Sequence, residues 1–562
     1  MNDIATQYGE NKHLEYGWSS DVQEELFQLT YQLTRCNSQR MVELANRLES
    51  IIQKIIICDI TLGKYQELMI TAYKLIGYTR DVIYGKGECD LAYMQIIVWY
   101  KFYPNLAKYA LCCFVQLDDG SHPYGSWKDI KYFCNYCIKS GLNEDHPLVQ
   151  YSLELITDQL RKEQCDSTHT LVAKWIPREK SNKFGWLFEK LAILYFPEYM
   201  KTATTYDQKV RAARKAKTEY RRLISKLNET LQTVQIKQCN GRWSQIDHSR
   251  TTSITMYKQK RSFLNLNDIN SEDRIECARK LAELINDPSD KDIKGKRISL
   301  NDFTKDAIRM LRNDATTQFE LDIINSQWRD NSNQSYKLGP MIAMLDCGNS
   351  MFCNDDGNPF YAALAVGCRI AEKSILGKRI LTFSSNPTWH NLEMCDTFTK
   401  MVKSIIDKET GLSSNFEKAL DLILDAYAEQ KLDAEETTGI TLAILSDMQI
   451  NENEKLFELE ILYDKIKENY SETGIKICGK PYKPPHILFW NFRSTSGFPC
   501  LSNVKNVSMI SGYNPTFLNR FHEKVANGIQ TTTPWISLFE SMNRERYKYM
   551  ENKIKRELVF LE

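Results

Sequence analysis

The chain has 562 residues, which is too long for a single hydrophobic core and predicts about two to four domains. Its 42% hydrophobic and 26% charged residues are ordinary for a soluble globular protein, and a net charge of +1 excludes neither nucleic acid nor protein partners. The 16 cysteines lack the spacing of a disulfide framework, and no apolar run is long enough to cross a membrane, so we expect a soluble protein with free thiols and no membrane partner.

The first half of the chain predicts helices and almost no strands. After a polar, weakly ordered lead over residues 1–20, we expect an all-helical domain over residues 21–328. Apolar residues recur there at spacings of three and four, for example in 23–33 and 41–52, and short turns separate the segments. Antiparallel helices joined by short turns are typical of a solenoid-like domain. The polar stretch 329–335 predicts a linker.

After the linker, predicted strands and helices alternate. This alternation predicts a doubly wound, mostly parallel α/β sheet domain over residues 336–530. A charged helix over residues 531–562 follows, and the sequence does not indicate what it packs against. The predicted strands are Pro340–Asp346, Arg379–Phe383, Ile440–Ser446, His486–Asn491 and Val507–Ser511.

Oxygen-bearing side chains lie where the predicted strands end. Asp346 and Ser350 follow the first strand, Asp447 follows the third, and Ser414 lies at the start of a helix. In parallel sheets, ligands bind at the carboxyl ends of the strands. Carboxylates and hydroxyls suit Mg²⁺ or another divalent cation, which would keep a position open for an acidic protein partner. We therefore expect these four residues to form a metal site.

This pattern resembles the metal-ion-dependent adhesion site of von Willebrand factor A (vWA) domains. That family has Asp-x-Ser-x-Ser on one loop, a Thr on a second loop and an Asp on a third. Asp346 and Ser350 match the first and last positions of the motif, Ser414 stands for the Thr, and Asp447 for the late Asp. Gly348 replaces the middle Ser, and the loss of its hydroxyl weakens the site. The alternative is a vWA-like fold whose metal site is degenerate.

Two basic segments predict contacts with nucleic acid. Residues 209–226 contain eight basic residues and one acid, and helical spacing places five of them on one face: Arg211, Arg214, Lys215, Arg221 and Arg222. Such a stripe neutralises phosphates. Residues 256–263 interleave Lys258, Lys260 and Arg261 with aromatic side chains that stack on single-stranded bases. The alternative is a solvated helix face whose cations are free or paired with acids.

Four turns in the helical half place Arg or Lys beside Trp, Tyr or Gly; they lie at 79–88, 124–129, 173–179 and 241–247. Together with the vWA-like half, this order resembles a family of largely uncharacterised proteins of giant DNA viruses, plants and microbes. The two-part design is also distantly similar to the TROVE module of the Ro ribonucleoprotein autoantigen. In that module a ring of helical repeats binds misfolded and small non-coding RNAs, and a vWA domain closes the ring.

These patterns and resemblances lead to two functional hypotheses. In the first, the chain is a non-enzymatic binding protein: the helical domain contacts small structured or single-stranded RNA, and the strand-end site binds a divalent cation and an acidic protein partner. In the second, it is a viral structural or assembly protein whose vWA-like domain mediates protein contacts without nucleic acid. We find no complete catalytic set. The expected location is intracellular, in the host cytoplasm or in the virion if the protein is viral.

Overall fold

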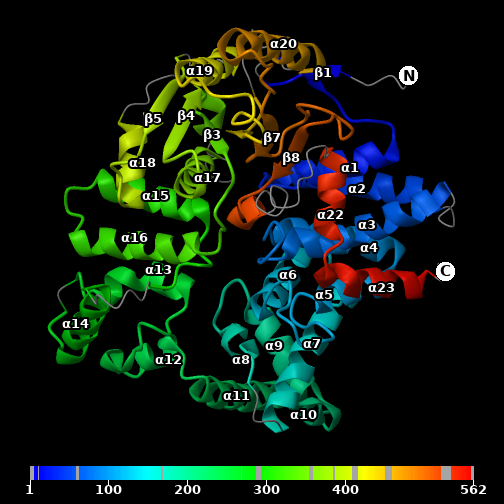
Figure 1. The fold of residues 1–562 in the computed structure, drawn as a ribbon. Helices are drawn as coiled ribbons and strands as arrows, with labels where there is room; N and C mark the ends of the chain where they lie inside the picture. The colour runs from blue at the N-terminus through cyan, green and yellow to red at the C-terminus, as the bar shows by residue number, and fades with distance from the viewer. Residues whose placement is uncertain are drawn as a thin grey trace.

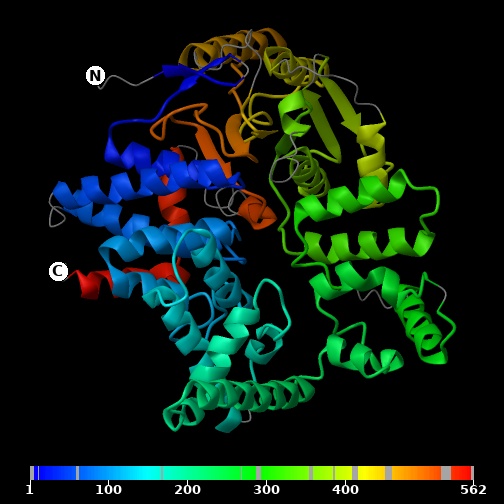
Figure 2. The same ribbon diagram turned by 180° about the vertical axis from the view of Figure 1, so that it is seen from behind.

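The path of the chain closes on itself. From the N-terminal helices the chain descends to α11, crosses to α12, rises through α15 and α16 to the sheet, and returns to the N-terminal helices (Figures 1 and 2). The computed structural model describes residues 6–10, 12–58, 63–165, 169–267, 269–286, 293–352, 359–383, 386–407, 416–449, 459–519 and 533–558.

The first helices stack into one body, which we call the helical column. Amphipathic spacing explains their packing: in α2 the buried residues are Leu44, Leu48, Ile51, Ile52 and Ile55, which lie on one side of the helix. The column consists of α1 (Val22–Gln32), α2 (Ser38–Ile57), α3 (Gly63–Arg80), α4 (Asp90–Phe102), α5 (Pro104–Cys112), α6 (Trp127–Lys139), α7 (Pro147–Cys165), α8 (Val172–Trp175), α9 (Gly185–Tyr195), α10 (Pro197–Lys201) and α11 (Tyr206–Thr230).

A second helical group follows α11 and packs against the sheet domain instead of the column. Part of it has its own small core, which includes Met256, Phe263, Leu281 and Ile323. The stacked rings of Trp328 and Phe398, 3.9 Å apart, join this group to α18 of the sheet domain. The group consists of α12 (Val234–Cys239), the 3-10 turn η1 (Trp243–Gln245), α13 (Ser253–Phe263), α14 (Glu272–Asn286), α15 (Leu300–Leu311) and α16 (Gln318–Ser332).

The sheet has six strands in the order β5-β4-β3-β6-β7-β8. All neighbours pair in parallel except the edge strand β5, which is antiparallel to β4 and was not predicted. The structure thus confirms a helical region followed by a mostly parallel sheet. The strands are β3 (Met341–Asp346), β4 (Arg379–Phe383), β5 (Thr388–Asn391), β6 (Thr441–Ser446), β7 (His486–Asn491) and β8 (Val507–Ser511).

Helices cover both faces of the sheet. In Figure 1 the strands lie between α17 on one side and α19 with α20 on the other. The β3 and β6 strands are buried along their whole length, as expected for a sheet covered on both faces. These helices are α17 (Pro359–Lys373), α18 (Phe398–Ile406), α19 (Phe416–Glu429) and α20 (Leu459–Cys478).

The polar stretch 329–335, predicted to be a linker, is partly helical and partly buried. Its first residues complete α16, and its polar side chains bond to α17. The Arg369 guanidinium, which is fully buried, donates to Asn331 Oδ1 at 2.9 Å and to Ser335 Oγ at 3.1 Å. The Ser332 hydroxyl donates to Glu372 at 2.9 Å. The polar composition of this stretch therefore reflects buried hydrogen bonds at Asn331, Ser332 and Ser335 as well as exposure at Arg329 and Asn333.

The lead over residues 1–20, predicted to be weakly ordered, contains a hairpin in its described part. Strands β1 (Thr6–Tyr8) and β2 (Leu14–Tyr16) pair in antiparallel register. Tyr16 exchanges two backbone hydrogen bonds with Phe498 in the sheet domain, at 3.1 and 3.0 Å. His13 and Glu15 are buried and lie 3.2 Å apart. These long-range contacts hold a segment whose own composition shows no strong preference for structure.

The C-terminal helices return to the helical column, which closes the path of the chain. Helices α22 (Pro534–Met542) and α23 (Lys548–Glu557) lie against α3 and α5 (Figure 1). Lys74 of α3 donates to Glu551 at 2.9 Å, and Asp81 accepts from Arg546 at 2.7 Å. Within the described residues, none of the helices has the length and apolar character needed to span a bilayer.

Candidate functional site

The carboxyl ends of β3 and β6 bring acidic residues to one edge of the sheet. The two strands are adjacent and parallel, with Leu345 opposite Leu445, so Asp346 and Ser446 end level with one another. The buried Asp346 carboxylate accepts hydrogen bonds from the Ser446 hydroxyl at 2.5 Å and the Gly348 amide at 2.8 Å. A Cβ on Gly348 would lie 3.0 Å from Asp346 Oδ1. The side chain missing from the vWA-like motif would therefore lie beside this carboxylate.

Asp447, the residue after β6, is fully buried and uses both carboxylate oxygens. Oδ1 accepts from the Ser350 hydroxyl at 3.0 Å and the Gln449 amide at 3.2 Å, and Oδ2 accepts from Arg493 Nε at 3.0 Å. Burial raises the pKa of the Asp447 carboxyl, although the Arg493 guanidinium acts in the opposite direction. The structure thus brings together Asp346, Ser350 and Asp447, three of the four predicted ligands. Ser414 lies outside the described residues.

Arg493 is the residue at this edge that the sequence pattern did not indicate. It follows β7 by two residues, and β7 neighbours β6 in the sheet. Its terminal nitrogens donate to the two oxygens of Glu10 at 3.0 and 2.7 Å. The guanidinium therefore links the carboxylates of Asp447 and Glu10. A basic residue just after a strand was the available signal, but its meaning depends on the strand order.

The oxygens that would bind a divalent cation at this edge already have partners within the protein. Magnesium requires a near-octahedral set of oxygen ligands, whereas both oxygens of Asp346 and of Asp447 accept hydrogen bonds from protein donors. Within the described ranges, no three His, Cys, Asp or Glu side chains gather as a metal site would need. Arg493 supplies a positive charge beside Asp447, and Glu10 supplies a carboxylate beside Arg493. Both the cation and the partner stay predictions.

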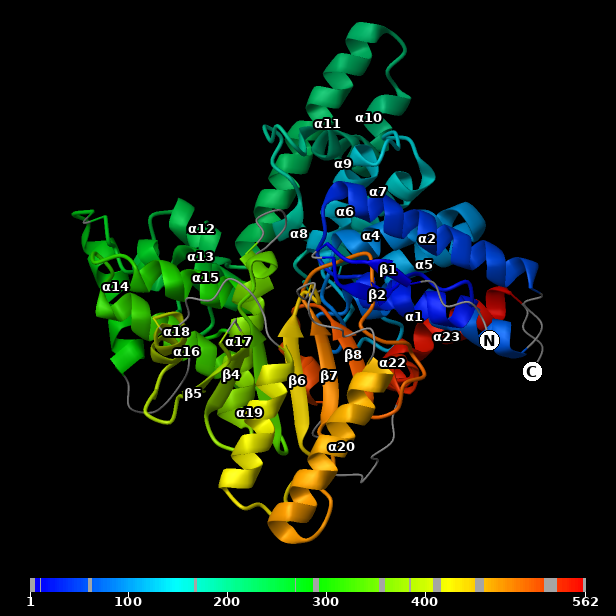
Figure 3. The ribbon, with the colours of Figure 1, turned by 90° about the horizontal axis from the view of Figure 1, so that it is seen from above.

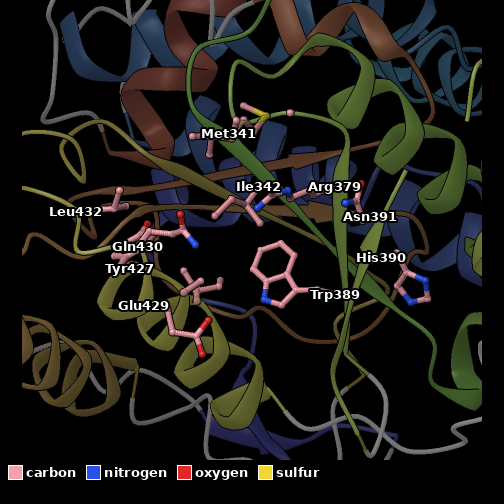
Figure 4. A pocket seen from close by; sticks show the side chains of 14 residues that line it. Met341, Ile342, Arg379, Trp389, His390, Asn391, Tyr427, Glu429, Gln430 and Leu432 are labelled. Atoms are coloured by element: carbon pink, nitrogen blue, oxygen red, sulfur yellow. The ribbon is translucent and has the colours of Figure 1, made fainter. Parts of the chain in front are cut away.

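A cavity of about 510 Å³ lies elsewhere in the sheet domain, between β5 and α19 (Figure 4). Trp389 of β5 and Tyr427 of α19 line it, together with Ile342. It adjoins Met341, the first residue of β3, whereas Asp346 is the last residue of that strand. The cavity is therefore separate from the acidic edge, and its lining is mainly apolar.

Helix α11 is anchored by one face and presents cations on the other. A capping box between Thr205 and Gln208 begins the helix, and Ala216, Tyr220 and Leu227 form its buried face. Figure 3 shows α10 and α11 at one extremity of the molecule. The five predicted cationic residues are all exposed: Arg211, Arg214, Lys215, Arg221 and Arg222.

Some of these cations have partners. Arg221 pairs with Glu179 at 3.3 Å, and Arg222 pairs with Glu219 at 2.8 Å. Lys215 lies over the ring of Tyr199, 4.4 Å from its centroid. Four exposed cations of α11 have no acidic partner among the described residues: Lys209, Arg211, Arg214 and Lys226. These four are free to meet phosphates.

The basic segment on α13 is less accessible than predicted. Lys260 is 3% exposed, and its Nζ lies 2.7 Å from Asp306 Oδ2. Burial lowers the pKa of Lys260, and Asp306 opposes this effect. Lys258 is exposed, while Arg261 is 59% exposed and lies 3.8 Å from Glu320. Contrary to the prediction, Lys260 is not available to RNA, because its side of α13 packs against the neighbouring helices.

The turns at 79–88 and 124–129 meet in the structure. Arg80 donates to both oxygens of Asp129, at 2.6 and 2.7 Å, and both side chains are buried. This pair holds α3 to α6. Arg80 and Asp129 of these two turns therefore serve the architecture of the column.

The fold and the acidic edge define a two-part protein, in which a helical column is joined to a mostly parallel sheet domain. Two family models match separate parts of the chain. Residues 340–558 match the family described as "Domain of unknown function (DUF7788)", and residues 150–275 match "Domain of unknown function (DUF2828)". The chain is also 25% identical, over 498 residues, to "Uncharacterized protein L728" of Acanthamoeba polyphaga mimivirus. That alignment covers 82% of this chain and 77% of the relative. These similarities support the predicted relation to giant-virus proteins, and the resemblances to vWA and TROVE proteins stay predictions.

Proposed function

We propose that the protein is a non-enzymatic RNA-binding protein, and that the exposed cations of α11 form its main RNA-contacting surface. One observation carries this proposal. Lys209, Arg211, Arg214 and Lys226 are exposed on a single helix and have no acidic partner among the described residues. Phosphates that contact such cations release their condensed counterions, and this release favours binding.

The sheet domain has a different part in the proposal. Its parallel strands, flanking helices and acidic edge at Asp346 and Asp447 support a vWA-like domain. We propose that this domain closes the path of the chain, as the vWA domain does in the TROVE design. The Arg493–Glu10 contact would keep the acidic edge bound to the chain's own N-terminal hairpin.

The test measures RNA binding at low salt from the fluorescence anisotropy of a labelled, structured RNA. The variant changes the four unpaired cations of α11 to Gln. A control variant changes four exposed lysines, of which three lie in the sheet domain and one precedes it, so that the net charge is the same. The control positions are Lys337, Lys467, Lys483 and Lys505.

We expect the α11 variant to bind RNA at least about tenfold more weakly than the control, because each lost phosphate contact weakens binding. No binding by the wild type, or equal loss in both variants, would contradict the proposal. The first of these results would favour the alternative, a structural or assembly protein that does not bind nucleic acid.

A further inference from the structure

Three lysines of the helical column surround a single aromatic ring. The Nζ atoms of Lys128, Lys131 and Lys183 lie 5.0, 5.5 and 5.2 Å from the centroid of Tyr132. They come from α6 and from the loop before α9, two segments that are far apart in the sequence. Lys131 also lies 5.2 Å from the ring centroid of Trp175 in α8. We call these three lysines the lysine cluster.

The lysine cluster has no counterion in the described part of the chain. None of its members forms an ion pair there, although Asp90 interacts electrostatically with Lys128 and Lys183 without forming an ion pair. Burial and the charges of Lys128 and Lys183 lower the pKa of Lys131 to about 8. The aromatic rings offset part of this repulsion, because a cation is attracted to the face of a ring. The rings cannot neutralise three positive charges, whereas an anion can.

The surroundings of the cluster favour a strand of RNA as the source of that anion. Helix α8 packs against α11: Asn228 of α11 donates to the Ala173 carbonyl at 3.1 Å, and Arg221 pairs with Glu179. The cluster is therefore close to the C-terminal half of α11. Tyr132 and Trp175 are only partly buried, so aromatic surface accompanies the positive charge. Phosphate contacts combined with aromatic stacking are typical of single-strand binding.

We infer that Lys128, Lys131 and Lys183 form a phosphate-binding site beside Tyr132 and Trp175, and that its ligand is an unpaired stretch of RNA. The identification of the ligand as RNA rests on the proposed function, whereas the phosphate site itself does not. It joins two sequence motifs, at 124–129 and 173–179, that the α11 surface leaves unexplained.

The first test measures the phosphate site without RNA. Inorganic pyrophosphate is added to the full chain, and thermal unfolding is followed. The variant changes the three lysines of the cluster to Gln; the control changes Lys467, Lys483 and Lys505 to Gln. We expect pyrophosphate to raise the Tm of the wild type and the control by about 2 °C or more, and to leave the cluster variant unchanged. An equal rise of Tm in the cluster variant, or no rise in the wild type, would contradict the proposed phosphate site.

The second test identifies the ligand with a labelled single-stranded RNA and a duplex of the same sequence. We expect the cluster variant to bind the single strand about tenfold more weakly than the control, and Trp175→Ala to weaken it while leaving duplex binding unchanged. A response to pyrophosphate without RNA binding by the wild type would refute the proposed function and the RNA ligand, but not the phosphate site. If the cluster variant binds RNA as tightly as the wild type while the α11 variant loses binding, the lysine-cluster site would be refuted and the proposed function would stand.

Discussion

Lys86 Nζ lies 2.6 Å from Ser511 Oγ, and this contact joins the helical column to the end of strand β8. The same ammonium group donates to the carbonyls of Thr30 and Leu33, at 2.5 and 2.8 Å, and Lys86 is 4% exposed. Nearby, Asn514 donates to the Gly85 carbonyl at 2.6 Å. The Gly-Lys-Gly turn is therefore a contact between the two halves of the chain.

Replacing Lys86 with Met should weaken this contact. The substitution keeps most of the apolar stem but leaves two buried carbonyls without their donor, which costs about 1–3 kcal/mol. We expect a lower midpoint of urea unfolding and faster proteolysis between the two halves. Lys483→Met, at an exposed position, is the control. Equal stability of the two variants would show that the contact contributes nothing.

The buried pair of Arg80 and Asp129 should be among the most sensitive positions in the column. Arg80→Met leaves a buried carboxylate without its cation, and we expect a loss of about 3–5 kcal/mol in urea unfolding. The matched control is Arg279→Met in α14, whose ion pairs with Glu276 and Glu283 are exposed to solvent, so that their loss should have a much smaller effect. The interpretation fails if both substitutions have the same small effect.

Arg493→Ala should expose the acidic edge to metal. Asp447 would then be buried without its positive partner, which lowers stability by about 3–5 kcal/mol. We expect Mn²⁺ to restore part of the Tm in this variant, to have no effect on the wild type, and to restore nothing when Asp447→Asn is added. Gly348→Ser, which returns a hydroxyl beside Asp346, should increase the restoration. A Mn²⁺ shift in the wild type as large as in Arg493→Ala would contradict the role given to Arg493.

The positions of the acidic residues at the strand ends were predictable because they depend on a local sequence pattern. A buried strand followed by a polar turn places Asp346 and Asp447 at the same edge whenever the sheet is parallel, and the structure does so. Arg493 and Glu10 were not predictable in this way. Their contacts depend on the strand order and on a hairpin held by another segment, which no local spacing reveals.

The two basic segments also differ in how well their local spacing predicted the exposure of their cations. Exposure of the predicted cations on α11 followed from helical spacing, because one face of that helix is strongly apolar and the other strongly cationic. In α13 the cations are spread around the helix, so the packing partner decides which one is buried. Lys260 faces Asp306 of α15, a contact between residues 46 positions apart. Spacing alone could not distinguish it from the exposed Lys258.

The pKa of Lys131 gives a prediction for pH. Its value of about 8 in the folded protein lies below the usual value of about 10.4 for an unfolded chain. Between these values the unfolded chain binds the proton more readily, so stability rises with pH from about 8 to about 10. Below pH 8 the protonated Lys131 opposes folding. We expect Tm to rise less between pH of about 8 and about 10 in Lys131→Met than in the wild type. The same pH dependence of Tm in the wild type and in Lys131→Met would contradict the crowding of positive charge around Tyr132.

The most direct test of RNA binding by α11 is the salt dependence of RNA affinity. Anisotropy titrations over a range of KCl concentrations give the slope of log Kobs against log[KCl] for the wild type, the four-site α11 variant and the charge-matched control. Each lost phosphate contact lowers the slope by about one unit, so the α11 variant should have a slope shallower by about two to four units, and the control should match the wild type. Equal slopes for the wild type and the α11 variant would contradict the account.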